Sequence, residues 1–460
     1  MSGDALQEAA SAPQAVRFGE ALRFWLKLGL ISFGGPAGQI AIMHRELVEQ
    51  RRWISEQRFL HALNYCMLLP GPEAQQLATY IGWLLHRTWG GIAAGALFVL
   101  PSLFMLIALS WIYIAFGHVD WVAGLFYGIK PAVVAIVLQA VWRIGGRTLK
   151  APSRSPLLWL IAIASFLAIA VWKLPFPWVV LGAALCGVAG GRWSPQQFGG
   201  GAAHAASQVH YGPALIDDHT PTPPHAQFRK MRLAAVALAG ALLWLLPMAA
   251  LVTWQGTGGT LTQMGWFFTK AALLTFGGAY AVLPYVYQGA VEQFQWLTGL
   301  QMIDGLALGE TTPGPLIMVV AFVGFVGGWA KAVLGPDLLF LGGALAATVV
   351  TWFTFLPSFL FILAGGPLVE ATHGRIGFTA PLTAITAAVV GSIASLALFF
   401  IVHVAQGAGA RELLGVRIDL AGLALSALAA VALMRLHWGV IPVIGGCALT
   451  GLALRLAGWV

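Results

Sequence analysis

Apolar segments of membrane-spanning length recur along most of the chain, separated by short polar stretches. The first half carries six of them, near residues 21–41, 59–87, 90–117, 120–142, 156–172 and 176–190. The second half carries six counterparts, near 264–288, 300–330, 337–364, 377–404, 418–435 and 438–458. A transmembrane helix needs about 20 predominantly apolar residues. The pattern therefore predicts an all-α polytopic membrane protein.

The two halves share a motif of the form F-x-x-K-x(5)-F-G-G. It reads FWLKLGLISFGG from Phe24 and FFTKAALLTFGG from Phe267, so the offset is 267 − 24 = 243 residues. The same offset aligns a Pro-Gly-Pro at 70–72 with another at 313–315. Self-similarity at a fixed offset without a gap indicates a duplicated unit.

The repeats divide the chain into five parts. We expect an N-terminal tail at 1–17, a first repeat at 18–193, a flexible linker at 194–231, a connector transmembrane helix at 232–256 and a second repeat at 257–460. The linker is rich in Gly, Ala, His, Pro and polar residues, a composition that cannot bury a core. An even number of segments per half plus one connector makes the halves antiparallel. Inverted repeats of this kind are typical of secondary transporters, whose substrate site lies where the halves meet.

Basic residues in the loops refine the predicted topology. Loops 42–58 and 143–155 both carry several arginines, and the positive-inside rule places such loops in the cytoplasm. Both are cytoplasmic if the first two segments of each repeat are broken or re-entrant helices, which we favour; six full crossings per repeat remain the alternative. The linker near Ser207 should then face the cytoplasm and the C-terminus at Val460 the periplasm.

The composition agrees with a membrane protein. Hydrophobic residues make up 59% of the chain and charged residues 9%, against about 25% charged in soluble domains. The net charge of +8 resides in short loops, so we expect the lipid bilayer and no nucleic acid as a partner. The first twenty residues show no signal-peptide pattern. No cysteine has metal-ligand spacing, so we expect no metal site and no cofactor. Four irregularly spaced histidines of the linker are interpreted as ordinary linker residues and not as metal ligands: His204, His210, His219 and His225.

The Pro-Gly-Pro motifs predict helix breaks inside membrane segments. Pro70 and Pro72 remove backbone donors and Gly71 allows close approach, as do Pro313, Gly314 and Pro315 in the second half. A helix that restarts after such a break presents free N–H groups and the positive end of its dipole, which favour a bound anion. The structural alternative is a kink that only shapes packing.

Further candidates for substrate binding flank these breaks. Lys27 and Lys270 precede the paired glycines in each repeat and would attract an anion, unless they extend to the lipid headgroups. Glu73 and Glu310 are candidates for proton coupling, or else hydrogen-bonded structural acids. The paired glycines allow either ligand contact or close packing of the backbone: Gly34, Gly35, Gly277 and Gly278. Neutral polar side chains nearby could replace the water shell of an oxyanion: Asn64, Gln75, Gln76, Thr311 and Thr312.

These motifs resemble the chromate transporter family in its long, two-domain form. The resemblance rests on FGGPAGQI and LLPGPEAQQLATYIGW in the first half and on TFGGAYAVLPYV and GETTPGPLIMVVAFVGF in the second. It covers nearly the whole chain apart from the N-terminal tail and the linker. It implies a bacterial inner-membrane protein that exports chromate, with sulfate as the look-alike anion and the proton gradient as the drive.

Other functions remain open at this point. Chromate and sulfate are both tetrahedral dianions with four acceptor oxygens, so the hydrogen-bond pattern does not separate them. An anion channel differs from a transporter only in coupling and turnover. A polytopic membrane enzyme would need clustered His, Asp or Glu, and the sequence shows isolated candidates, so we expect no enzyme. The oligomeric state is open, with a homodimer as one option.

Overall fold

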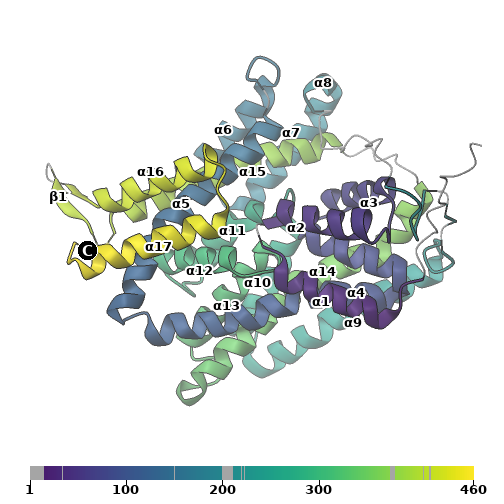
Figure 1. Cartoon of the computed structure of the whole chain (residues 1–460), viewed down its shortest axis with the longest axis horizontal. Helices are drawn as coiled ribbons and strands as arrows, with labels where there is room; N and C mark the ends of the chain where they lie inside the picture. Colours follow the sequence, from purple (N-terminus) through teal and green to yellow (C-terminus); the bar gives the residue numbers. More distant parts are fainter. Residues whose placement is uncertain are drawn as a thin grey trace, which may run out of the picture.

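The computed structural model describes residues 15–33, 35–149, 151–198, 211–218, 220–221, 223–372, 379–407, 409–413 and 416–459 (Figure 1). The first half contains α1 (Phe18–Ile31), α2 (Gly35–His44), α3 (Glu56–Leu68), α4 (Glu73–Phe116), α5 (Asp120–Thr148), α6 (Pro156–Ala170), α7 (Phe176–Trp193) and the short α8 (Pro195–Phe198). The connector is α9 (Lys230–Gln255). The second half contains α10 (Thr260–Leu274), α11 (Leu283–Tyr287), α12 (Gly299–Thr311), α13 (Val319–Ala330), α14 (Leu339–Thr372), α15 (Thr379–Ala405), α16 (Leu420–Met434) and α17 (Val440–Leu456).

Short irregular helices and one hairpin complete the described chain. They are π-helices at Arg45–Gln50 and Gln288–Gln293, 3-10 helices at Ala279–Val282, Leu316–Met318 and Pro336–Leu338, and strands β1 (Arg411–Leu413) and β2 (Val416–Ile418). The two strands pair antiparallel. Apart from this hairpin the described elements are helical, which confirms the predicted all-α fold.

Several helices are suited to the bilayer. Five described helices are long and apolar enough to cross it: α4, α5, α9, the segment Pro336–Leu368 and α15. Only 17% of the most apolar window of α9 is buried, so most of that window would face lipid. The chain is therefore a multi-pass membrane protein, as predicted.

The first two segments of each repeat are broken helices. α1 has 14 residues and α3 has 13, and their counterparts α10 and α12 have 15 and 13. At about 1.5 Å per residue each is roughly 20 Å long, shorter than the hydrocarbon core of about 30 Å. The interruptions fall at the paired glycines and at the Pro-Gly-Pro motifs, where the sequence predicts them.

The two halves exchange helices with each other. α5 of the first half packs against α16 and α17 of the second, and α15 of the second packs against α6 and α7 of the first (Figure 1). Under the repeat, α5 corresponds to α15, and α6 and α7 correspond to α16 and α17. Such reciprocal packing is what two repeats related by a two-fold axis produce.

Part of the segment expected to be a flexible linker is docked on the first half. The N–H groups of Leu215 and Ile216 donate to the carbonyls of Arg52 and Trp53 at 2.9 and 3.1 Å, and the Ser55 N–H donates to the Ile216 carbonyl at 3.0 Å. These strand-like bonds hold the described part of the linker against the turn before α3. Ser207 and Val460, which mark the predicted topology, lie outside the described residues.

Candidate functional site

The broken helices of the two halves meet through a reciprocal pair of backbone hydrogen bonds. The N–H of Gly71 donates to the carbonyl of Thr275 at 2.8 Å, and the N–H of Gly314 donates to the carbonyl of Ser32 at 2.9 Å. The pairs are equivalent under the repeat, since 314 − 71 = 243 and 275 − 32 = 243. We call these four residues and the side chains that touch them the crossing. It is the point where the Pro-Gly-Pro break of one half contacts the glycine break of the other.

Backbone geometry explains why glycine occupies both breaks. Gly71 has φ +124° and Gly314 has φ +108°, a region that side-chain-bearing residues rarely adopt. A Cβ on Gly71 would lie 2.3 Å from the hydroxyl of Ser358, and one on Gly314 would lie 2.8 Å from the Cβ of Ser102. The glycines therefore allow both the chain reversal and the close approach of a serine from the opposite half.

Each Pro-Gly-Pro is followed by a helix start without a side-chain cap. α4 begins at Glu73 after Pro72, and the helical run continuing into α13 begins at Leu316 after Pro315. Neither proline can cap the start, and the first N–H groups of a helix have no partner within it. Two positive dipole ends and their free donors thus border the crossing, as an anion site requires.

Buried polar side chains surround these helix starts. Gln39 donates through Nε2 to the Gly314 carbonyl at 2.5 Å, and Gln76 donates to the Pro70 carbonyl at 2.8 Å. Within the described chain, three buried serine hydroxyls at the crossing have no hydrogen-bond partner: Ser32, Ser102 and Ser358. Buried polar groups in native proteins are usually paired. Unpaired donors at this place suit a polar ligand.

The two predicted proton-coupling carboxylates, from different halves, approach one short segment. Glu310 is 5% exposed and accepts a hydrogen bond from the Tyr280 hydroxyl. Glu73 lies against Gly278, where an added Cβ would be 4.0 Å from its Oε1. Gly278 and Tyr280 are two residues apart, so the structure brings the two carboxylates to the same segment although the repeat does not align them.

Positive charge reaches these carboxylates from α5. Arg147 lies within electrostatic range of Glu73, and Arg143 lies within that range of Glu310, without forming an ion pair. In the sequence both arginines are part of a basic loop and count only as topology signals. Their spacing of four residues places them on one face of a helix, which is the signal that could have identified them as a pair.

A buried ion pair links the halves beside this region. Lys130 Nζ on α5 lies 3.5 Å from Asp304 Oδ2 on α12, and the Tyr113 hydroxyl donates to the same oxygen at 2.9 Å. Asp304 is 2% exposed. The sequence shows Asp304 and His61 as equivalent positions but gives no sign that Lys130 reaches the carboxylate, because the contact joins different repeats.

The two lysines at equivalent positions of the repeat motif have partners other than the residues of the crossing. Lys27 has a side chain 55% exposed and lies 3.7 Å from Glu46. Lys270 is exposed on α10, with Nζ 5.5 Å from the centre of the Trp266 ring. The contacts of both ammonium groups are therefore with residues outside the crossing.

The remaining predicted residues lie along the breaks, except Gly34, which falls outside the described residues. Gly35, Gly277 and Gly278 have positive φ angles of 71°, 78° and 99°. Gln75 donates to the Thr79 hydroxyl at 3.0 Å, and Asn64 is half-buried on α3. Thr311 and Thr312 turn their hydroxyls to carbonyls of their own helix, so they are less free to bind a ligand than the serines.

The described residues contain no group of three or more His, Cys, Asp or Glu arranged to hold a metal ion. Of the linker histidines only His225 is described, and its Nε2 lies 2.9 Å from the Trp83 carbonyl.

Comparison with known proteins gives consistent matches over both halves. The family described as "Chromate transporter" matches residues 19–188 and 262–452. A chromate transport protein of Pseudomonas aeruginosa is 36% identical over 85% of this chain and 82% of its own length. One from Cupriavidus metallidurans is 30% identical over 80% of this chain and 79% of its own length. A probable chromate transport protein of Synechococcus elongatus is 29% identical over 81% of each chain. No solved structure matches the chain significantly.

Proposed function

The chain belongs to the chromate transporter family, and we propose that it is a secondary transporter that exports chromate from the cytoplasm across the inner membrane. The similar proteins named for chromate transport cover about four fifths of the chain, which favours a transporter over an enzyme. The observation that carries the proposed site is the crossing, where two uncapped helix starts and three unpaired serine hydroxyls come together. This arrangement supplies donors for an anion.

The proposed binding mode follows from the chemistry of the anion. Chromate has four acceptor oxygens, which can take hydrogen bonds from the N–H groups after Pro72 and Pro315 and from the serine hydroxyls of the crossing. Removing an ion from water costs several kcal/mol even after the protein relaxes, so compensating charge is needed. Arg143 and Arg147, which lie within electrostatic range of Glu310 and Glu73, are the cations that would supply it. All these groups belong to one chain, so the proposed site does not require a dimer.

For coupling we propose the two carboxylates that face residues 278–280. A carboxylate inside the membrane is costly when charged and is relieved by a proton. Glu73 and Glu310 would take protons entering from the periplasm and release them to the cytoplasm while the anion moves outward. Outward movement of a dianion and inward movement of protons both carry net positive charge inward, so an inside-negative membrane potential and an inward proton gradient would both drive export.

Uptake of labelled chromate into everted membrane vesicles with an imposed proton gradient tests the proposal. The wild-type protein should accumulate chromate when the gradient drives protons outward from the vesicle lumen, and unlabelled sulfate should compete if the site reads only tetrahedral shape and charge. Uptake that equilibrates without accumulation would indicate a channel. If the vesicles take up sulfate but not chromate, the transported anion is sulfate and the proposal for chromate is wrong.

Conservative variants separate binding from coupling. Glu73→Gln and Glu310→Gln keep shape and hydrogen bonding but cannot lose a proton. We expect at least one of them to keep chromate binding while uptake becomes independent of the imposed gradient. If both variants respond to the gradient as the wild type does, the two carboxylates serve structure and the coupling site lies elsewhere.

A further inference from the structure

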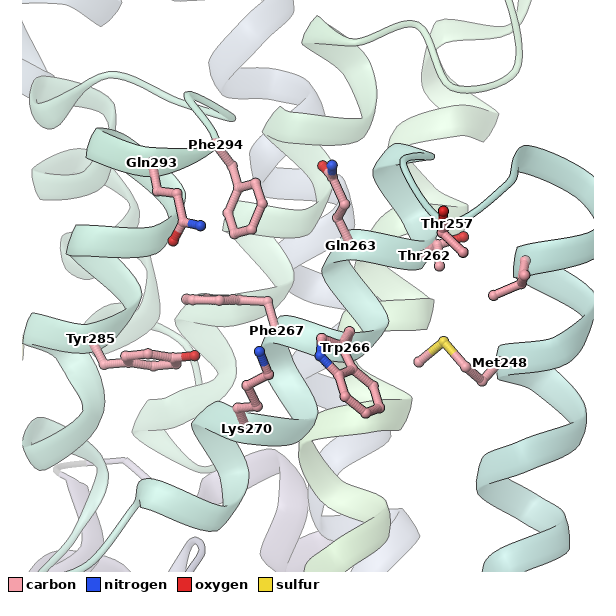
Figure 2. A pocket seen from close by; sticks show the side chains of 11 residues that line it. Met248, Thr257, Thr262, Gln263, Trp266, Phe267, Lys270, Tyr285, Gln293 and Phe294 are labelled. Carbon is pink, nitrogen blue, oxygen red and sulfur yellow. The ribbon is translucent and has the colours of Figure 1, made fainter. Parts of the chain in front are cut away.

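A groove of about 460 Å³ lies beside α10, and its lining includes none of the four residues that define the crossing (Figure 2). α9 forms one wall through Met248 and Val252, and the segment from Tyr285 to Phe294 forms the other. Between them, Trp266 and Lys270 rise from α10 into the groove. Trp266 is 51% exposed, so the groove opens to the surroundings of the helices, which for a membrane protein are lipid.

Lys270 is a cation without a counter-charge among the described residues. Its counterpart in the first half, Lys27, has Glu46 as a partner. The position equivalent to Glu46 is 46 + 243 = 289, and it holds Gly289. A Cβ on Gly289 would lie 2.1 Å from the Phe267 ring, so the ring occupies the place of the lost carboxylate. An unpaired ammonium inside a membrane protein calls for an anion.

A second polar group in the groove also lacks a partner. The Thr262 hydroxyl is buried and has no hydrogen bond within the described structure. It lines the groove together with Lys270 and the side-chain amides of Gln263 and Gln293. These groups offer hydrogen-bond donors, and no lining residue is acidic. The groove therefore presents donors and one positive charge at its polar part and hydrocarbon elsewhere.

The position of the groove fits a lipid phosphate. α9 is a spanning helix that ends at Gln255, so Thr257 and Thr262 lie near the bilayer edge. Lys270 is eight residues beyond Thr262, or about 12 Å along the helix. Its side chain points back along α10 toward Gln263, as helical side chains do, which brings the ammonium closer to that edge (Figure 2).

We propose that this groove binds an anionic phospholipid, with its phosphate at Lys270, the rest of its polar headgroup toward Thr262 and an acyl chain along Met248 and Val252. The charge argues for an anionic lipid rather than a zwitterionic one. A choline or ethanolamine group would bring a second positive charge close to Lys270, and no residue that lines the groove is acidic and could pair with it.

The test is lipid retention by the purified full chain. The wild type, Lys270→Met, Lys270→Arg and Lys27→Met are delipidated, exposed to equal amounts of phosphatidylglycerol and phosphatidylcholine, and analysed for bound lipid by native mass spectrometry. Lys27→Met is the matched control because it removes the equivalent lysine where a carboxylate partner is present. Size-exclusion chromatography and the thermal midpoint without lipid show whether each variant is folded. No transport is measured, so the result is independent of the transported anion.

We expect the wild type to retain phosphatidylglycerol over phosphatidylcholine and Lys270→Met to bind it about tenfold more weakly, equivalent to about 1.4 kcal/mol. Lys270→Arg should keep most of the binding because it keeps the charge, and Lys27→Met should equal the wild type. Equal retention by Lys270→Met and wild type would overturn the proposal, as would an equal loss in Lys27→Met or equal retention of both lipids. Displacement of phosphatidylglycerol by chromate would overturn it in favour of a transport site. If Lys270→Met does not fold, the test rests on the binding by Lys270→Arg and on the wild type's preference for phosphatidylglycerol over phosphatidylcholine. Equal retention of the two lipids by both proteins would then overturn the proposal.

Discussion

The two halves of the molecule have the same backbone arrangement at the crossing but different side chains around it. At the crossing, the hydrogen bonds of Gly71 and Gly314 are equivalent, and both glycines have the same unusual φ range. The side chains around them are not equivalent. Four polar residues of the first half have apolar counterparts at the offset of 243, namely Gln39 and Val282, Glu73 and Leu316, Gln75 and Met318, and Gln76 and Val319.

This difference shows that the two repeats keep the same backbone hydrogen bonds at the crossing, whereas the side chains around these bonds are free to differ. The backbone hydrogen bonds depend on proline and glycine. Both repeats must therefore keep these residues if the two halves are to contact each other at the crossing. Side-chain chemistry is needed only once at a shared site, so one copy can lose it. The second half instead supplies Glu310 and Tyr280. Breaking the shared backbone should therefore have a large effect from either half, whereas side-chain changes should depend on the half.

The largest effect is expected at the shared glycines. Gly71→Ala and Gly314→Ala would each place a Cβ within 2.8 Å of an opposing serine, at a φ that costs about 1–3 kcal/mol for other residues. We expect chromate uptake per folded molecule to fall at least about tenfold in both, as about 1.4 kcal/mol would produce. Gly182→Ala, with no atom within 4 Å, is the control and should match the wild type. Tolerance of one substitution but not the other would show that the two breaks are not equivalent.

The next effect is on stability and not on uptake, and it concerns an interaction that has no equivalent in the repeat. Lys130 and Asp304 join the halves, whereas the position equivalent to Asp304 at the offset of 243 holds His61. Removing one partner of a buried ion pair costs about 3–5 kcal/mol, because the other charge is left unpaired. Asp304→Asn and Lys130→Met should each lower the thermal midpoint in detergent.

The double variant distinguishes a structural pair from separate contacts. If the loss comes from an unpaired charge, combining Asp304→Asn with Lys130→Met should recover part of the stability. Additive losses would mean that the two residues do not depend on each other.

Local features of this site could be predicted from the sequence, and long-range partners could not. Pro and Gly restrict the backbone within a few residues, so the breaks at Pro70–Pro72 and their equivalents follow from the sequence alone. The bond from Gln39 to Gly314 joins residues 275 apart, and nothing near Gln39 indicates it. The repeat motif makes Lys27 an anion candidate by its position, and nothing near it in the sequence indicates that its ammonium lies 3.7 Å from Glu46 in the following π-helix.

A smaller effect is expected when the first half is made to resemble the second. Gln39→Val copies Val282 and removes the donor to the Gly314 carbonyl. A buried acceptor left without a partner costs about 1–3 kcal/mol. We expect chromate uptake to fall by about tenfold, for about 1.4 kcal/mol, with the chain still folded. Gln197→Val, which loses a surface hydrogen bond, is the control. Unchanged uptake in Gln39→Val would mean that the crossing does not need this polar contact.

The smallest effect is expected at Lys27, although the repeat motif makes it prominent. Its ammonium is 3.7 Å from Glu46 and its side chain is 55% exposed, and ion pairs of this kind contribute about 0–1 kcal/mol. Glu46 also faces Arg51 at 3.5 Å, so it keeps a partner when Lys27 is replaced. Lys27→Met should therefore leave the chromate concentration for half-maximal uptake within about twofold of the wild type, a difference of about 0.4 kcal/mol. A tenfold increase on matched amounts of protein would instead place Lys27 in the path of the anion, and the compensating charge assigned to Arg143 and Arg147 would have to be shared with the first half's own lysine.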